Sequence, residues 1–255
     1  MSTVAPAAIP TASTAETRIA SYLLTEYLER LGVEVIFGLC GHTVIALLDA
    51  LGKSRIRFIS TRHEQVAAHA ADGYARASGK PGVLLTHLGP GLTNACTGVA
   101  NAALDSIPMV VIAGDVPSYY HGRHPHQEVN LHQDADQFQI YRPFCKRVYR
   151  VDRVADLPRI MERAFHLSQA GRPGPVLIDE PMDLFSEDLP VDAFQKVPAE
   201  MSRPTIRRRP PNGSSTRSPR PSGLCCTRAA AFSQREQRRN WRRSPKRSRF
   251  LSPTH

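Results

Sequence analysis

The sequence predicts an α/β fold in which a parallel sheet is covered by helices on both faces. Short apolar runs without polar alternation, such as residues 109–113 (Met-Val-Val-Ile-Ala), are typical of strands that are buried on both sides. Segments with apolar residues at helical spacing separate these runs, as Ile19, Tyr22 and Leu23 do near the start of the chain. Strands that alternate with helices in this way form parallel sheets.

The alternation can be followed in order from residue 15 to residue 181. We expect helices at 19–28, 42–51, 63–78, 92–104 and 155–170, and strands at 33–37, 56–60, 82–86, 109–113 and 175–179. Gly32 ends the first helix, because glycine favours the end of a helix. From Pro117 to Pro143 the periodicity fails and four histidines occur. A loop of this length in a compact domain is usually functional, so we expect it to lie over a site or an interface.

Composition divides the chain into parts. We predict a flexible leader at 1–15, a folded domain at 16–187, a linker at 188–206 and a disordered basic tail at 207–255. Residues 205–255 carry 14 Lys and Arg against one acidic residue, a net charge of +13, whereas the whole chain carries +10. Residues 1–204 therefore carry −3, and the basic charge belongs to the tail.

The leader and the cysteines predict a cytoplasmic protein. The leader has no basic residue and no apolar run long enough for a signal peptide or a membrane span. Cys40, Cys96 and Cys145 are scattered singly, and neither they nor the adjacent Cys225 and Cys226 have the spacing of a zinc site or a disulfide framework. This usage fits a reducing compartment.

Three motifs stand out: Arg-His-Glu at 62–64, Asp-Gly-Tyr-Ala-Arg at 72–76 and Gly-Pro-Gly-Leu-Thr-Asn at 89–94. The glutamate of the first and the turn of the third each enter a helix, with a short apolar strand between them, so both should lie at the same edge of the parallel sheet. A glutamate at a helix start between apolar segments can occupy a dry pocket, although Glu64 could also be an ordinary helix cap. The Gly-Pro-Gly turn could let the backbone approach a ligand or could be a simple tight turn. Gly73 alone would indicate only close packing against a neighbouring element. The layout suits a flat heterocycle.

Together with Gly-Val-Ala-Asn-Ala at 98–102, Asp-Ser at 105–106 and Gly-Arg-Pro-Gly-Pro-Val at 171–176, these motifs resemble the pyrimidine-binding domain of the thiamine-diphosphate-dependent enzymes, in particular the acetolactate synthase-like branch. The resemblance extends from about Glu16 to about Glu187. It implies the thiamine-diphosphate-binding fold and makes Glu64 the catalytic acid/base group, which exchanges a proton with the aminopyrimidine. It also implies decarboxylation of a 2-oxo acid, most simply pyruvate, and transfer of the two-carbon unit to a second carbonyl compound.

The resemblance also assigns cofactor-binding residues: Leu39, Gly41, Pro90, Gly91, Asn94 and Gln127. The chain departs from the family at Cys40, where proline is common, at His42, which is often glycine, and at His87-Leu88, where small hydroxyl residues are usual. We interpret His87 as hydrogen-bonded structure rather than as a proton donor to substrate. The histidines of the long loop lack the spacing of metal ligands, so we expect no metal site there.

The resemblance implies that the pyrimidine domain of one subunit faces the diphosphate domain of another, so we expect a homodimer or homotetramer. The Gly-Asp-Gly motif that marks the Mg²⁺ and diphosphate domain of the family does not occur in the sequence. We therefore expect Mg²⁺ only in a complete enzyme and this chain to be inactive alone. FAD, the exact substrate and the acceptor are left open, and another thiamine-diphosphate-dependent decarboxylase or lyase is the alternative.

The tail at 207–255 has three interpretations. A frameshift near Arg207, with premature termination after His255, would give its Arg, Pro, Ser and Ala bias in a GC-rich gene, and we favour this hypothesis. A basic arm that binds nucleic acid ranks lower, because no aromatic interleaving supports it apart from the lone Trp241. The third interpretation is a plain disordered basic extension. For the chain as a whole, a regulatory fragment that pairs with an intact homologue is a further possibility.

Overall fold

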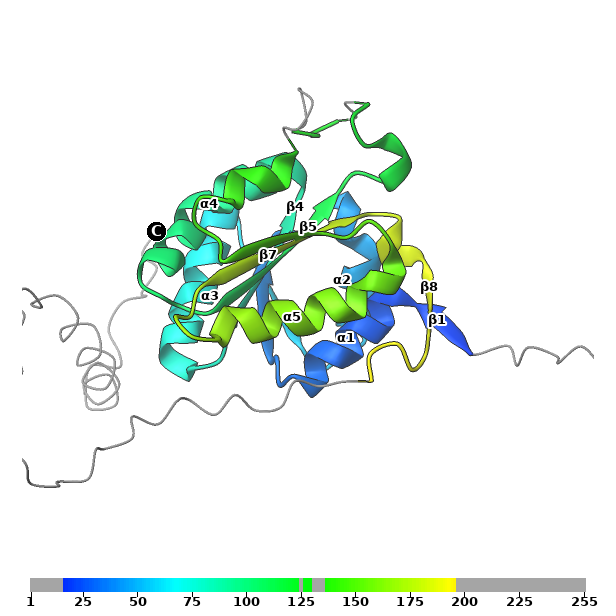
Figure 1. Cartoon of the computed structure of the whole chain (residues 1–255), viewed down its shortest axis with the longest axis horizontal. Coiled ribbons are helices and arrows are strands. Elements are labelled where there is room, and N and C mark those ends of the chain that lie inside the picture. The colour runs from blue at the N-terminus through cyan, green and yellow to red at the C-terminus, as the bar shows by residue number, and fades with distance from the viewer. Residues whose placement is uncertain (1–15, 124–125, 130–135, 196–255) are drawn as a thin grey trace, which may run out of the picture. The chain divides into compact units, whose positions relative to one another are not determined.

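The fold is built around a six-stranded sheet (Figure 1), and the computed structural model describes residues 16–123, 126–129 and 136–195. The strand order is β3-β2-β4-β5-β7-β6, and every neighbouring pair is parallel. The strands are β2 (Val35–Gly38), β3 (Arg57–Ser60), β4 (Gly82–His87), β5 (Met109–Asp115), β6 (Arg147–Arg150) and β7 (Pro175–Pro181). The predicted α/β class with a parallel sheet is confirmed.

Helices cover both faces of this sheet (Figure 1). One face carries α1 (Ala20–Arg30), α2 (Ile45–Gly52) and α5 (Leu157–Gln169), and the other carries α3 (Glu64–Ser78) and α4 (Leu88–Leu104). Alternate side chains of β5 enter the two cores: Val110 and Ile112 pack on the first face, and Met109 and Val111 on the second. The unbroken apolar runs in the sequence therefore reflect burial on both sides.

The structure contains strands that the apolar pattern does not reveal. β6 has the sequence Arg-Val-Tyr-Arg and lies at one end of the sheet, where it pairs with β7 only. β1 (Thr17–Ile19) pairs antiparallel with β8 (Asp188–Pro190) in a separate two-stranded sheet. The folded unit thus continues past the predicted boundary at residue 187, since Leu189 and Phe194 are buried in the first core. The leader and the tail lie outside the described residues.

The segment between Pro117 and Pro143 is not one uniform loop. It includes the 3-10 turns η2 (Ser118–Tyr120) and η3 (Gln137–Tyr141), while residues 124–125 and 130–135 lie outside the described part. Phe138 and Tyr141 pack into the second core, and the Tyr141 hydroxyl donates a 2.6 Å hydrogen bond to the Leu92 carbonyl. The end of the segment therefore serves packing. Three further 3-10 turns are η1 (His42–Val44), η4 (Val154–Asp156) and η5 (Leu184–Ser186).

Helices α3 and α4 pack closely at Gly98. A Cβ on Gly98 would lie 2.5 Å from the Ala68 Cβ, whereas a Cβ on Gly73 would meet nothing within 4 Å. The idea that Gly73 marks the close contact is therefore wrong for this chain, because the glycine that lets the helices approach is in α4. Among the described residues, no helix combines the length and the apolar character needed to cross a membrane.

Candidate functional site

Glu64 begins α3 at the carboxyl edge of the sheet. Its side chain is 6% exposed, and its Oε2 accepts a 3.0 Å hydrogen bond from Nδ2 of Asn94 on α4. The helix cap is His63 instead, whose Nδ1 accepts from the backbone N–H of Gln65. Glu64 is therefore not the capping residue, and its second carboxylate oxygen, Oε1, makes no hydrogen bond to another residue in the part of the chain that the structure describes.

The Gly-Pro-Gly motif lies within the first turn of α4 and not before it. The helix begins at Leu88, four residues earlier than predicted, because Leu88 takes a left-handed backbone conformation (φ 50°) that turns the chain directly out of β4. Pro90 is tolerated there, since N–H groups in the first turn have no partner within the helix. A Cβ on Gly89 would lie 2.0 Å from Cγ2 of Val129, so this turn touches the long loop.

The loop after β2 reaches the same edge through Gly41. Its backbone is extended (φ −156°), so the glycine is needed for space: a Cβ there would lie 2.1 Å from Cγ of His87. Two residues later, the Thr43 hydroxyl lies 2.8 Å from Nδ1 of His87. Leu39 is half-buried beside this loop and has no polar side-chain atom, so it can only shape the edge.

His87 joins Gln127 to the site. Its Nε2 lies 3.1 Å from Oε1 of Gln127, and its ring packs edge-on against His42 with centroids 4.6 Å apart. Burial lowers the pKa of His87, and the charge of Glu64 acts on it in the opposite direction. The interpretation of His87 as a hydrogen-bonded residue is confirmed by these contacts.

The structure thus brings the predicted residues together in two pairs on one edge. Asn94 contacts Glu64, and Gln127 reaches the edge through His87. Pro90 and Gly91 contribute backbone in the first turn of α4, with Gly91 buried against Thr86. The sequence predicted that His87 is hydrogen-bonded, but it did not identify Thr43 and Gln127 as its partners.

Buried acids that were not predicted lie at the same ends of β5 and β7. Asp115, Asp179 and Glu180 are at most 2% exposed, and Asp179 Oδ1 accepts a 2.8 Å hydrogen bond from Gln137 at the end of the long loop. Burial raises the pKa of all three carboxyl groups, and the neighbouring Asp115 raises that of Asp179 further. This bond anchors the loop whose earlier part carries Gln127.

The described residues contain no group of three or more His, Cys, Asp or Glu side chains placed to hold a metal ion. Of the four loop histidines, His121 lies 3.2 Å from Asp136, while His124 and His132 are outside the described part of the chain. The polar groups at the edge are instead the carboxyl group of Glu64 and the amide groups of Asn94 and Gln127. This set fits an aminopyrimidine, because a carboxyl group can exchange a proton with a ring nitrogen.

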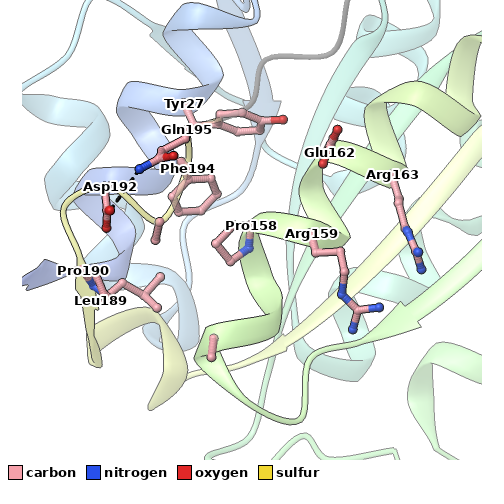
Figure 2. A pocket seen from close by; sticks show the side chains of 12 residues that line it. Tyr27, Pro158, Arg159, Glu162, Arg163, Leu189, Pro190, Asp192, Phe194 and Gln195 are labelled. Atoms are coloured by element: carbon pink, nitrogen blue, oxygen red, sulfur yellow. Dashed lines mark hydrogen bonds between the residues drawn. The ribbon is translucent and has the colours of Figure 1, made fainter.

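A cavity of about 650 Å³ lies elsewhere, between α1, α5 and the segment at 189–195 (Figure 2). Tyr27 and Phe194 pack together on one side of it, with ring centroids 5.0 Å apart, and Arg159 and Glu162 of α5 lie across from them (Figure 2). No predicted site residue lines this cavity. The edge around Glu64 is the better candidate, because the titratable and hydrogen-bonding groups converge there.

Comparison with known proteins finds similarity to thiamine pyrophosphate enzymes. Residues 19–139 match the family described as thiamine pyrophosphate enzyme, N-terminal TPP binding domain. The chain is 44% identical over 165 residues to a probable acetolactate synthase large subunit of Methanococcus aeolicus and 45% identical over 165 residues to the acetolactate synthase large subunit of Lactococcus lactis. It is 42% identical over 185 residues to the chloroplastic acetolactate synthase of Arabidopsis thaliana. These matches cover 64–71% of this chain but only 26–28% of each relative's length.

Proposed function

We propose that residues 19–139, which match the thiamine pyrophosphate enzyme N-terminal TPP binding domain, bind the pyrimidine half of thiamine diphosphate in an acetolactate synthase-like enzyme that acts on a 2-oxo acid. The observation that carries the proposal is the Glu64 carboxyl group. It is nearly buried, it is held on one oxygen by Asn94, and it lies at the edge where the glycine-containing turn begins α4.

When bound, thiamine diphosphate supplies the carbanion chemistry of the reaction. Glu64 holds or gives the proton that a ring nitrogen of the aminopyrimidine needs. Asn94 donates to Oε2 and thereby fixes the orientation of the carboxyl group, which would leave Oε1 to the aminopyrimidine. The low exposure of Glu64 keeps water from competing for this proton.

The proposed reaction is decarboxylation of pyruvate with transfer of the two-carbon unit to a second carbonyl compound. The similarity to acetolactate synthases supports it. We further propose that Mg²⁺ and the diphosphate are held outside this domain, and that the assembly is a homodimer or homotetramer in the cytoplasm. The unusual residues Cys40, His42 and His87 around the site keep another thiamine-diphosphate-dependent decarboxylase or lyase as the second candidate.

The binding proposal is tested by saturation-transfer NMR on the full chain with thiamine and with thiamine diphosphate as separate probes. If only the pyrimidine half is contacted, both probes should give similar signals on their pyrimidine protons, and Mg²⁺ should change neither. Glu64→Gln should weaken both signals, whereas the control His69→Ala, at an exposed position of α3, should not. Absence of transfer from either probe to the wild-type chain would exclude this site.

The activity proposal is tested by thiamine-diphosphate-dependent pyruvate consumption, measured when this domain is assembled with a diphosphate-binding domain. Removing a general acid/base typically lowers a rate by roughly 10²–10⁴-fold, so Glu64→Gln should lose activity on that scale. A rate equal to that of the wild type would exclude Glu64 as the acid/base group.

A further inference from the structure

The ring of His87 is held on both sides by residues from distant parts of the chain. Thr43 Oγ1 lies 2.8 Å from Nδ1, and Gln127 Oε1 lies 3.1 Å from Nε2. Thr43 belongs to η1 after β2, Gln127 belongs to the long segment after β5, and His87 ends β4. One half-buried imidazole thus links the two loops that flank the candidate site.

The hydrogen-bonding capacity of the three side chains decides the tautomer. An amide oxygen can only accept, so Nε2 of His87 must carry the hydrogen that Gln127 Oε1 receives. Nδ1 of the neutral ring then accepts from the Thr43 hydroxyl. Both ring nitrogens are engaged within the protein, whereas the amide N–H groups of Gln127 make no hydrogen bond to another described residue and can be offered to a ligand.

The surroundings of His87 favour this arrangement. Gly41 leaves the space that the ring fills, and Leu88 and Gln127 both have left-handed backbones (φ 50° and 69°). Such conformations are costly for residues other than glycine and concentrate at functional sites. The groups that face the ring are His42, His126, Glu64 and Gln127; burial outweighs the charge of Glu64 and lowers the pKa of His87, which keeps the ring neutral.

We propose that His87 is a positioning residue that fixes the Gln127 side chain at the edge carrying Glu64, so that the two Gln127 amide N–H groups can donate to an oxygen of the substrate, such as the carboxylate of a 2-oxo acid. Glu64 and Gln127 then have different tasks: the first exchanges a proton and the second binds an oxygen. The identity of the substrate rests on the proposed function, but the link between Thr43, His87 and Gln127 does not.

Two substitutions separate the two bonds. The shorter amide of His87→Asn reaches the place of Nδ1 and can keep the Thr43 contact, whereas the longer amide of His87→Gln reaches the place of Nε2 and can keep the Gln127 contact. Backbone hydrogen exchange of residues 126–129 is measured by mass spectrometry on the full chain. The control is His69→Ala.

A hydrogen bond of ordinary net strength corresponds to about a fivefold change in an opening equilibrium, so His87→Asn should speed exchange at 126–129 about fivefold and His87→Gln should restore it. Nitrogen-15 NMR of the wild-type imidazole should identify the neutral Nε2–H tautomer, with a pKa below the usual value for histidine. Equal exchange in the wild type and His87→Asn, or an Nδ1–H tautomer, would overturn the positioning role.

The donor role is tested with pyruvate as the probe. Gln127→Glu keeps an oxygen that can accept from His87 but removes both N–H donors. Saturation transfer to pyruvate should fall at least about tenfold, the loss expected when an anion loses a charge-assisted donor. Unchanged transfer would overturn the donor assignment. If thiamine does not bind but hydrogen exchange at residues 126–129 changes as expected in the His87 variants, the proposed function is excluded. The contact of His87 with Thr43 and Gln127 would still hold.

Discussion

The contact between α3 and α4 sets the separation of Glu64 and Asn94, and it depends on the absence of a side chain at Gly98. A Cβ at that position would lie 2.5 Å from the Ala68 Cβ, 3.1 Å from the His69 backbone nitrogen and 3.2 Å from the Ala68 carbonyl carbon. These atoms belong to a helix backbone and a methyl group, which cannot rotate away. Gly98→Ala must therefore push the helices apart.

The expected cost follows from two opposing effects. Overpacking a close contact costs roughly 1–3 kcal/mol, while replacing glycine by alanine inside a helix returns up to about 1 kcal/mol. With the full return, Gly98→Ala should therefore lower the free energy of unfolding by up to about 2 kcal/mol. Gly73→Ala on α3 has the same helical benefit and no clash, so it should raise the free energy of unfolding by up to about 1 kcal/mol.

Urea unfolding of the full chain, followed by circular dichroism, measures both changes, provided that the slope with denaturant stays constant. Ala68→Gly removes the methyl group that the new Cβ would meet, so the double variant should recover part of the loss in a double-mutant cycle. A Gly98→Ala protein more stable than the wild type, or a cycle without coupling, would refute the packing argument.

Three further changes probe the site and its support. Gly41→Ala should displace the His87 ring and speed hydrogen exchange at residues 126–129, as His87→Asn does; unchanged exchange would contradict the contact. Tyr141→Phe should lower the free energy of unfolding by about 1 kcal/mol in urea, since it removes a buried hydrogen bond to α4. Asp179→Asn removes a carboxyl group whose pKa is raised by burial and by Asp115. The folded wild type binds that proton more tightly than the unfolded chain, so its stability is full below the usual Asp pKa and falls as pH rises through the folded value. Relative to the wild type, the free energy of unfolding of Asp179→Asn should therefore increase from pH 5 to pH 8 in urea experiments. A difference that stays constant over this range would contradict the raised pKa of Asp179.

The central sheet could be predicted from the sequence because strands that are buried on both faces have uninterrupted apolar runs. The run at 109–113 has no polar residue, and β5 is indeed buried throughout. β6 could not be predicted in this way, since the strand has an arginine at each end and only two apolar residues between them; Arg147 is exposed and Arg150 is half-buried at the edge of the sheet. β1 and β8 have three residues each, which is too short for a periodicity to appear.

The residues of the candidate site that belong to a sequence motif could be predicted. The residues whose role depends on contacts between distant segments could not. Glu64 and Asn94 lie in motifs, and the structure joins them. The start of α4 was placed too late because Gly-Pro-Gly usually indicates a turn, and nothing in a leucine side chain signals the left-handed backbone of Leu88. The role of His87 depends on contacts with two loops, and the sequence does not show that these loops meet at this residue.

Strand register explains why those loops can meet at His87. Residues His87, Gly114 and Glu180 are register partners on β4, β5 and β7, so they share one face of the sheet. The central member has no side chain, and a Cβ there would lie 2.3 Å from Thr43 Oγ1. Thr43 can therefore reach His87 only because Gly114 has no side chain that would occupy the position of the Thr43 hydroxyl. Gly41 and Gly114 act together: one leaves room for the imidazole and the other for the hydroxyl that holds it.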